Sequence, residues 1–185
     1  MPMSYGSRKG QKVDWIVLHY PVAPGCNAKW CYDYYNKPNV TKSAHFAVDE
    51  NSVVSIVPCD LAAFHCSTGG KVVYCGANNL NSIGIDLMDR KISCKTKSVC
   101  DCDWYIPENT LDLAADFIAR LIGIYKIPLD HVVRHYDVTH KACPRPLCGD
   151  DVNQYYGISG NQKWNKFKTK IEEFLFFFDA DVVQL

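Results

Sequence analysis

The sequence has no excess of charge of either sign and no long hydrophobic run. Its 20 basic residues are balanced by 20 acidic ones, so no long-range field would attract an anionic polymer such as nucleic acid. The first residues have no apolar segment behind their charges, and the longest apolar windows, such as residues 117–125, are interrupted by charge and too short to cross a bilayer. The sequence therefore predicts a protein made in the cytoplasm, with no signal peptide and neither nucleic acid nor a membrane as its partner.

Cysteine pairs with the C-x-x-C spacing are absent, although the chain contains ten cysteines. In a reducing compartment cysteines are more often free thiols or metal ligands than disulfides. Without such pairs a standard zinc finger is not predicted. Cys94, Cys100 and Cys102 lie close together in the sequence, and they could hold a second metal ion, form a disulfide or remain free thiols.

Internal repeats, low-complexity segments and linkers are also missing. A length of 185 residues is ordinary for one domain, and a chain of this size buries roughly 70% of its unfolded surface. We therefore expect a single domain over residues 1–185, with its core at about residues 12–178.

Hydrophobic spacing predicts that strands and helices are mixed along the chain. Short apolar runs predict strands at residues 14–23, 82–88 and 131–138, and two such runs around a polar centre predict a hairpin at residues 44–58. Helical spacing predicts helices at residues 27–38, 111–125 and 164–178. This mixture is typical of an α/β protein with helices on both faces of a sheet.

Two histidines end predicted strands, and a cysteine follows the second of them. His19 ends "WIVLH", His135 ends "HVVRH", and Cys143 comes eight positions later, before Pro144 and Pro146. Two imidazoles and one thiolate form a three-ligand zinc site whose fourth tetrahedral position is open to water. Taken singly, each of these residues is more often a structural histidine or an inert thiol, so spacing alone leaves both interpretations open.

Five segments occur in an order that resembles type 2 N-acetylmuramoyl-L-alanine amidases. They are "IVLHY", "SAHFAVDENSVVSIVP", "AFHC", "NSIGIDLM" and "HYDVTHKACPRP". The resemblance runs from Trp15 to the "WNKFKTKI" helix, which is nearly the whole chain. This family includes phage lysozyme-amidases and shares its fold with peptidoglycan recognition proteins. The resemblance implies a central mixed β-sheet flanked by helices, one zinc ion, and hydrolysis of the amide between N-acetylmuramic acid and L-alanine in bacterial peptidoglycan.

The resemblance also implies a role for individual residues. Lys141, two positions before the cysteine of the K-x-C-P element, matches the family's catalytic lysine. His45 and His65 match histidines that shape the substrate pocket. The implied zinc ligands are His19, His135 and Cys143.

One part of the implied site departs from the family. Members usually carry a tyrosine just before the "SAH" histidine or a glutamate in the "IGIE" strand, whereas this chain has Ala44 and Asp86 at those places. Asp86 keeps the carboxylate but is one methylene shorter. We expect Asp86 to carry protons during catalysis, with a purely structural acid as the alternative. His131 and His140 are expected to be surface residues.

Two other functions compete with the amidase interpretation. One is a non-catalytic peptidoglycan-binding module of the same fold, and the open zinc position argues against it because binding alone needs no such position. The other is a cysteine-rich zinc or redox protein, which the missing C-x-x-C pairs disfavour. The absent signal peptide favours a phage or prophage endolysin that reaches the wall with a holin, and a cellular autolysin is the alternative. No separate cell-wall-binding domain is expected, and the sequence does not define the oligomeric state or the target bacterium.

Overall fold

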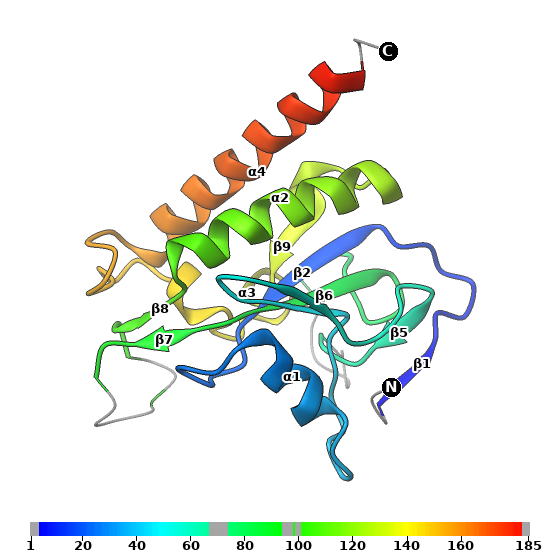
Figure 1. Cartoon of the computed structure of the whole chain (residues 1–185), viewed down its shortest axis with the longest axis horizontal. Coiled ribbons are helices and arrows are strands. Elements are labelled where there is room, and N and C mark those ends of the chain that lie inside the picture. Colours follow the sequence, from blue (N-terminus) through cyan, green and yellow to red (C-terminus); the bar gives the residue numbers. More distant parts are fainter. Residues whose placement is uncertain (1–3, 67–73, 94–97, 99–100, 183–185) are drawn as a thin grey trace.

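A mixed five-stranded sheet forms the centre of the computed structural model, which describes residues 4–66, 74–93, 98 and 101–182 (Figure 1). Four of its strands are parallel to one another, and the fifth, at one edge of the sheet, forms an antiparallel hairpin with its neighbour. The predicted mixed sheet is therefore confirmed. In spatial order the strands are β4 (Val53–Ser55), β3 (Phe46–Val48), β6 (Ser82–Leu87), β2 (Trp15–His19) and β9 (Val132–Arg134).

Two small antiparallel pairs, which the sequence did not predict, lie beside the central sheet. Strand β1 (Tyr5–Ser7) pairs with β5 (Leu61–Ala63), and β7 (Arg90–Lys91) pairs with β8 (Trp104–Tyr105). Each of these strands has only two or three residues, which is too short for an alternating hydrophobic pattern to be recognised.

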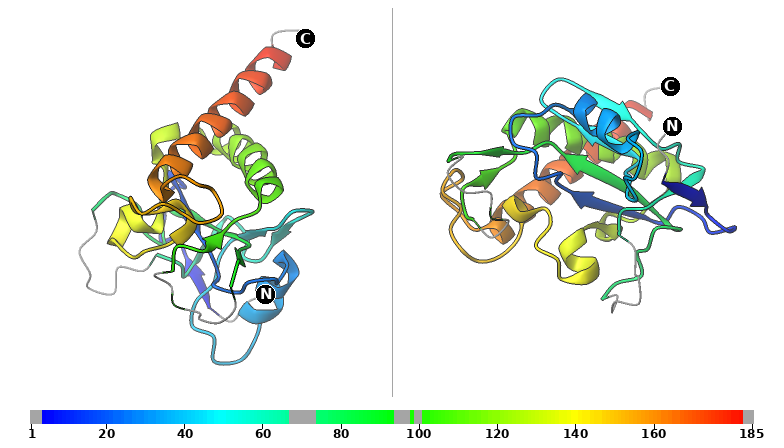
Figure 2. Two further views of the ribbon diagram at one scale, coloured as in Figure 1. Left: turned by 90° about the vertical axis from the view of Figure 1, so that its left-hand side faces the viewer. Right: turned by 90° about the horizontal axis from the view of Figure 1, so that it is seen from below.

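Helices cover both faces of the central sheet, as predicted. Helices α2 (Glu108–Tyr125) and α4 (Gly160–Val182) lie on one side, and α1 (Ala28–Tyr35) lies on the other (Figure 2). Two 3₁₀ turns, η1 (Leu129–His131) and η2 (Arg145–Leu147), flank the short helix α3 (His135–Thr139). Among the residues that the structure describes, no helix is both long and apolar enough to cross a bilayer.

The alternation of side chains along β2 divides the molecule into two sides. Ile16 and Leu18 pack in the main core with α2 and α4, whereas Val17 belongs to a separate apolar cluster. Because successive side chains of a strand point to opposite faces, His19 lies on the same side as Val17, away from α2 and α4. The polar residue at the end of β2 therefore reaches the side of the sheet that carries the loops and α1.

The C-terminal helix follows its predicted apolar stripe. Trp164, Phe167 and Ile171 are buried against α2, and Phe174 and Leu175 are partly buried there. The predicted member Phe178 lies outside the part of α4 whose side chains are described.

The predicted strand at residues 131–138 was wrong in its second half. Strand β9 ends at Arg134, and the chain turns into α3 at His135. Asp137 causes the turn, because its Oδ2 accepts the backbone N–H of Arg134 at 2.8 Å while its Oδ1 accepts a guanidinium N–H of Arg134 at 2.7 Å. A carboxylate at the third helical position that accepts the backbone N–H of the N-cap residue stabilises the start of a helix. Here this interaction ends the strand that the preceding β-branched residues favour.

Cysteines in the described part of the chain are free thiols. Cys102 is one of them, whereas Cys94 and Cys100 lie outside the described residues. The second metal site or disulfide considered for these three cysteines therefore stays untested.

Candidate active site

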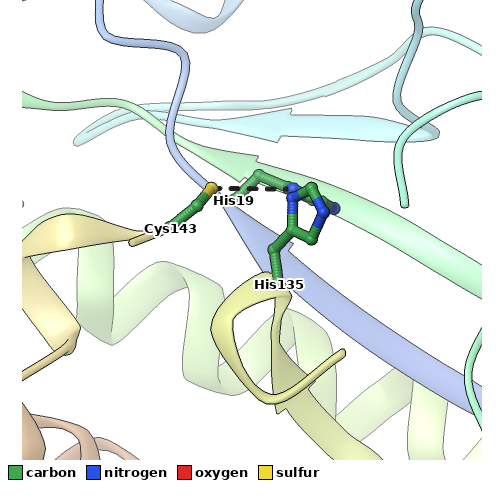
Figure 3. Close-up of side chains that lie close together, drawn as sticks. All are labelled: His19, His135 and Cys143. Atoms are coloured by element: carbon green, nitrogen blue, oxygen red, sulfur yellow. Dashed lines mark hydrogen bonds between the residues drawn. The ribbon is translucent and has the colours of Figure 1, made fainter. Parts of the chain in front are cut away.

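The three predicted metal ligands lie together at one edge of the sheet (Figure 3). One ligand atom from each of His19, His135 and Cys143 lies within 4.8 Å of the other two, and all three residues are buried. The rings of His19 and His135 meet edge to face with their centroids 4.8 Å apart. Cys143 Sγ lies 3.8 Å from His19 Nδ1.

The parallel pairing of β2 and β9 explains why the two histidines meet. Leu18 is the register partner of Arg134, so His19 and His135 follow a matched pair at the same edge. Carboxyl ends of adjacent parallel strands are where open α/β sheets place their sites. Cys143 is brought back to this edge because its carbonyl accepts the backbone N–H of Tyr136 at 2.9 Å.

The donor set and its spacing fit a zinc ion. Zinc binds neutral imidazole and thiolate ligands in a tetrahedron, and with bond lengths of about 2.0 Å to nitrogen and 2.3 Å to sulfur two such ligands lie roughly 3.5 Å apart. The 3.8 Å between Cys143 Sγ and His19 Nδ1 is close to that separation. Binding would use His19 through Nδ1, and its other ring nitrogen would remain free to donate a hydrogen bond.

Burial sets the protonation states of these ligands in the metal-free protein. It lowers the pKa of His19 well below its usual value, and the neighbouring His65 and His135 lower it further. Burial also raises the pKa of the Cys143 thiol to about 12, with the charge of Lys141 acting in the opposite direction. The imidazole is therefore already in its ligand form, whereas the thiol must lose a proton when a metal binds.

His65 holds the ring of His19 from the side opposite the metal position. His65 Nδ1 lies 2.9 Å from His19 Nε2, so it accepts the Nε2–H when His19 binds through Nδ1. His65 Nε2 then faces Ser82 Oγ at 3.2 Å. Such hydrogen bonds fix the orientation and tautomer of metal-binding histidines. His65 therefore lines the cleft and also contacts His19, one of the predicted zinc ligands.

A glycine in β6 makes room for His65. A Cβ atom on Gly84 would lie 2.5 Å from Cγ and 2.7 Å from Nδ1 of the His65 ring, distances that real Cβ atoms essentially never reach. The glycine of the "SIGID" segment is thus explained by the close approach of an imidazole to the backbone.

His45 lies in the protein interior rather than in the wall of the cleft. It is fully buried, its Nδ1 accepts the backbone N–H of Gly84 at 2.9 Å, and its Nε2 lies 3.1 Å from the carbonyl oxygen of Leu61. Its ring lies 5.7 Å from that of His65. Direct contact of His45 with substrate stays a prediction. In the structure its ring connects β6, through Gly84, to β5, through Leu61.

Asp86, the penultimate residue of β6, lies directly beside His19. The two residues are register partners in adjacent parallel strands, and Asp86 is only 3% exposed. Burial raises the pKa of its carboxyl to about 6, although a hydrogen bond from Tyr35 and the charges of Lys42 and Lys141 lower it. Tyr35 donates its phenol O–H to Asp86 Oδ2 at 2.6 Å.

Lys141 and Lys42 border the space in front of these groups. Both lysines, together with Phe64 and His65, line a cleft of about 530 Å³ and also a smaller cavity of about 100 Å³ that reaches the ligands. His19, Cys143 and Asp86 line the smaller cavity. A larger hollow of about 620 Å³ lies elsewhere, between residues 7–13 and the end of α2, and it contains none of the predicted site residues.

Two residues of this site, Tyr35 and Lys42, were missed by sequence reasoning. Tyr35 was included only in a predicted helix, where Ala28, Cys31 and Tyr35 share one buried face. Lys42 precedes the "SAH" segment without any pattern of its own. A signal for Tyr35 existed in the aromatic richness of "WCYDYY", but only the packing of α1 against the sheet, where it contacts β3 and β4, selects the tyrosine that meets Asp86.

Solved structures with a similar fold include a catalytic domain of XlyA, with a TM-score of 0.65 and 24% identity over 92% of this chain and 90% of that one. The PlyG catalytic domain also gives 0.65, with 23% identity over 89% of this chain and 84% of that one. These similarities support the fold.

Curated relatives extend the comparison to sequence. The N-acetylmuramoyl-L-alanine amidase BlyA of Bacillus subtilis (strain 168) is 28% identical over 93% of this chain and 45% of its own length. The amidase CwlL of Bacillus licheniformis is 32% identical over 73% of this chain and 37% of its own length. The chain thus spans less than half the length of these relatives. A sequence model of one family matches residues 9–146, and the chain belongs to this family, the N-acetylmuramoyl-L-alanine amidases.

Proposed function

We propose that the protein is a zinc-dependent N-acetylmuramoyl-L-alanine amidase. Its substrate would be the amide that joins the lactyl group of N-acetylmuramic acid to L-alanine in bacterial peptidoglycan. The observation that carries the proposal is the buried cluster of His19, His135 and Cys143, whose ligand atoms lie within 4.8 Å of one another in a chain of this family. The names of the curated relatives support the same activity.

The residues around the cluster can be assigned to steps of amide hydrolysis. His19, His135 and Cys143 would hold the zinc ion, which would supply a bound water of pKa ~7 and a positive charge for the scissile carbonyl. Lys141 would stabilise the negative charge that develops on the carbonyl oxygen, an effect worth on the order of 3 kcal/mol for a single donor. Asp86 would take a proton from the attacking water and give it to the nitrogen of the leaving L-alanine.

The cleft provides a place for the substrate next to these groups. Thr41 and Asn79 line this cleft, and it shares Lys42 and Lys141 with the smaller cavity that the predicted ligands line. A solved amidase of the same fold, AmiD from E. coli, has been seen with anhydro-N-acetylmuramic acid-L-Ala-D-gamma-Glu-L-Lys, at 19% identity and a TM-score of 0.55. We infer that the muropeptide of this protein's substrate occupies the cleft with its scissile amide toward His135.

An assay on purified peptidoglycan tests the proposal. Incubation should release peptides that begin with L-alanine, detected by labelling new amino termini and by mass spectrometry. A chelator should abolish the release and added zinc should restore it. New reducing sugar ends without new amino termini would instead identify a glycosidase. Binding to peptidoglycan without any cleavage, in protein shown to contain zinc, would identify the non-catalytic binding module.

The setting in which the amidase acts is part of the same proposal. A solved structure of a mutant endolysin from Bacillus subtilis has a TM-score of 0.65 and 25% identity to this chain, which supports a role in lysis of the cell wall. Expression of the protein in a bacterial cytoplasm, with and without a holin, tests it. Lysis that depends on the holin is the result expected for an endolysin.

A further inference from the structure

The last residue of α1 connects this helix to the proposed proton carrier. Tyr35 donates its phenol O–H to Asp86 Oδ2 at 2.6 Å, and both side chains are buried. A distance of about 2.5–2.7 Å is typical of a hydrogen bond from a neutral hydroxyl to a carboxylate, which is stronger than a bond between neutral groups. The two residues also line the small cavity that reaches the metal ligands.

Helix α1 is anchored so that the phenol has a fixed position. At its start, Asn27 Oδ1 accepts the N–H of Trp30 at 3.0 Å, and Asp49 Oδ2 accepts the N–H of Ala28 at 2.8 Å. Along its buried face, Cys31 contacts Met88 through their sulfur atoms at 3.5 Å. These contacts fix the start and the middle of the buried face of α1, so the backbone that carries Tyr35 is positioned independently of its hydrogen bond to Asp86.

We propose that Tyr35 is a positioning residue for Asp86, which holds Oδ2 in place and so presents Oδ1 as the oxygen that exchanges protons with the water and the leaving amine. This inference rests on the proposed amidase function. The aspartate side chain is short, and the torsion that orients its carboxylate is only weakly restricted. Proton transfer requires that donor and acceptor lie at hydrogen-bond distance. A fixed second partner therefore matters more for a short acid than for a long one.

The environment of the phenol supports a donor role. Burial, together with the neighbouring Asp86, raises the pKa of Tyr35 well above its usual value. The phenol therefore keeps its proton throughout the neutral range and remains a hydrogen-bond donor to the carboxylate. The cationic groups that act on the same carboxylate, Lys42 and Lys141, line the same cavity but lie in loops outside α1, so the hydrogen bond from α1 is separate from their charges.

Replacing Tyr35 with phenylalanine tests the inference, because it removes only the hydroxyl. Loss of a hydrogen bond to a charged group should lower kcat about tenfold to hundredfold, with KM, zinc content and melting temperature little changed. Tyr32→Phe is the matched control, since Tyr32 lies on the same helix but is exposed to solvent, and it should leave kcat unchanged. In an Asp86→Asn background, Tyr35→Phe should cause no further loss.

Two results would overturn the inference while leaving the amidase function intact. One is a normal kcat in Tyr35→Phe, and the other is an equal loss of kcat with and without the Asp86 carboxylate. Crystal structures of the zinc-loaded protein give a readout that does not depend on turnover. The plane of the Asp86 carboxylate should rotate in Tyr35→Phe, and an unchanged plane would refute the positioning role. A wild-type protein that holds zinc but releases no amino termini would refute the proposed function instead.

Discussion

Gly84→Ala should weaken zinc binding without touching a zinc ligand. The added Cβ would lie 2.5–2.8 Å from three atoms of the His65 ring, and the ring is confined by His19 on one side and His45 on the other. The ring must therefore move, which breaks the 2.9 Å contact between His65 Nδ1 and His19 Nε2. Loss of such a hydrogen bond typically costs 10- to 100-fold in metal affinity, which corresponds to about 1.4–2.7 kcal/mol of binding free energy.

Competition with a chromophoric chelator would measure this loss as a zinc dissociation constant. Gly123→Ala is the matched control, because nothing lies within 4 Å of the Cβ position there, and alanine in a helix should stabilise the fold by up to about 1 kcal/mol. Adding His65→Ala to Gly84→Ala should relieve the crowding and restore the melting temperature, but zinc affinity should stay low. A wild-type dissociation constant in a folded Gly84→Ala protein would refute the assignment of His65 as the group that orients His19.

Three further predictions concern the metal and the proton carrier. Cys143→Ser replaces a soft thiolate with a poor hydroxyl ligand, so zinc content and amidase activity should fall together; full zinc occupancy measured by atomic absorption would remove Cys143 from the ligand set. Asp86→Asn should lower turnover about 100-fold at unchanged zinc content, whereas Asp86→Glu should keep substantial activity. Near-normal turnover in the asparagine variant would show that the Asp86 carboxylate has only a structural role. Zinc affinity should rise with pH, because burial raises the pKa of the Cys143 thiol to about 12 and binding must release that proton; affinities that are equal at pH 6 and pH 8 would contradict this.

Sequence reasoning succeeded where the signal was local. The apolar run of β2 ends at a histidine, the hairpin of β3 and β4 surrounds a polar turn, and α2 repeats apolar residues at helical spacing; each was predicted and each is present. The three predicted ligands were also brought together. Local patterns suffice for the strands and the helix because the period of apolar side chains already indicates which element forms. The set of three ligands came from the resemblance to the amidase family, since spacing alone left both interpretations of these residues open.

Contacts between distant residues could not be predicted in the same way. Tyr35 and Asp86 are separated by 51 positions in the chain, and nothing in "WCYDYY" distinguishes Tyr35 from its neighbours until α1 is packed against the sheet. The turn at His135 was missed for a different reason. The β-branched residues before it favour a strand, while the Arg134–Asp137 contacts that start α3 involve polar side chains whose partners only become clear in three dimensions.

The three predicted metal ligands come from parts of the chain that are far apart in sequence. His19 and Cys143 are 124 positions apart, so an ion held by both would act as a removable cross-link between the first strand of the central sheet and the loop after α3. A ligand that binds only the folded chain adds about 2.7 kcal/mol to its stability when its free concentration is 100 times its dissociation constant. Resistance of the protein to heat and proteases would then follow the supply of free zinc around it, independently of any substrate.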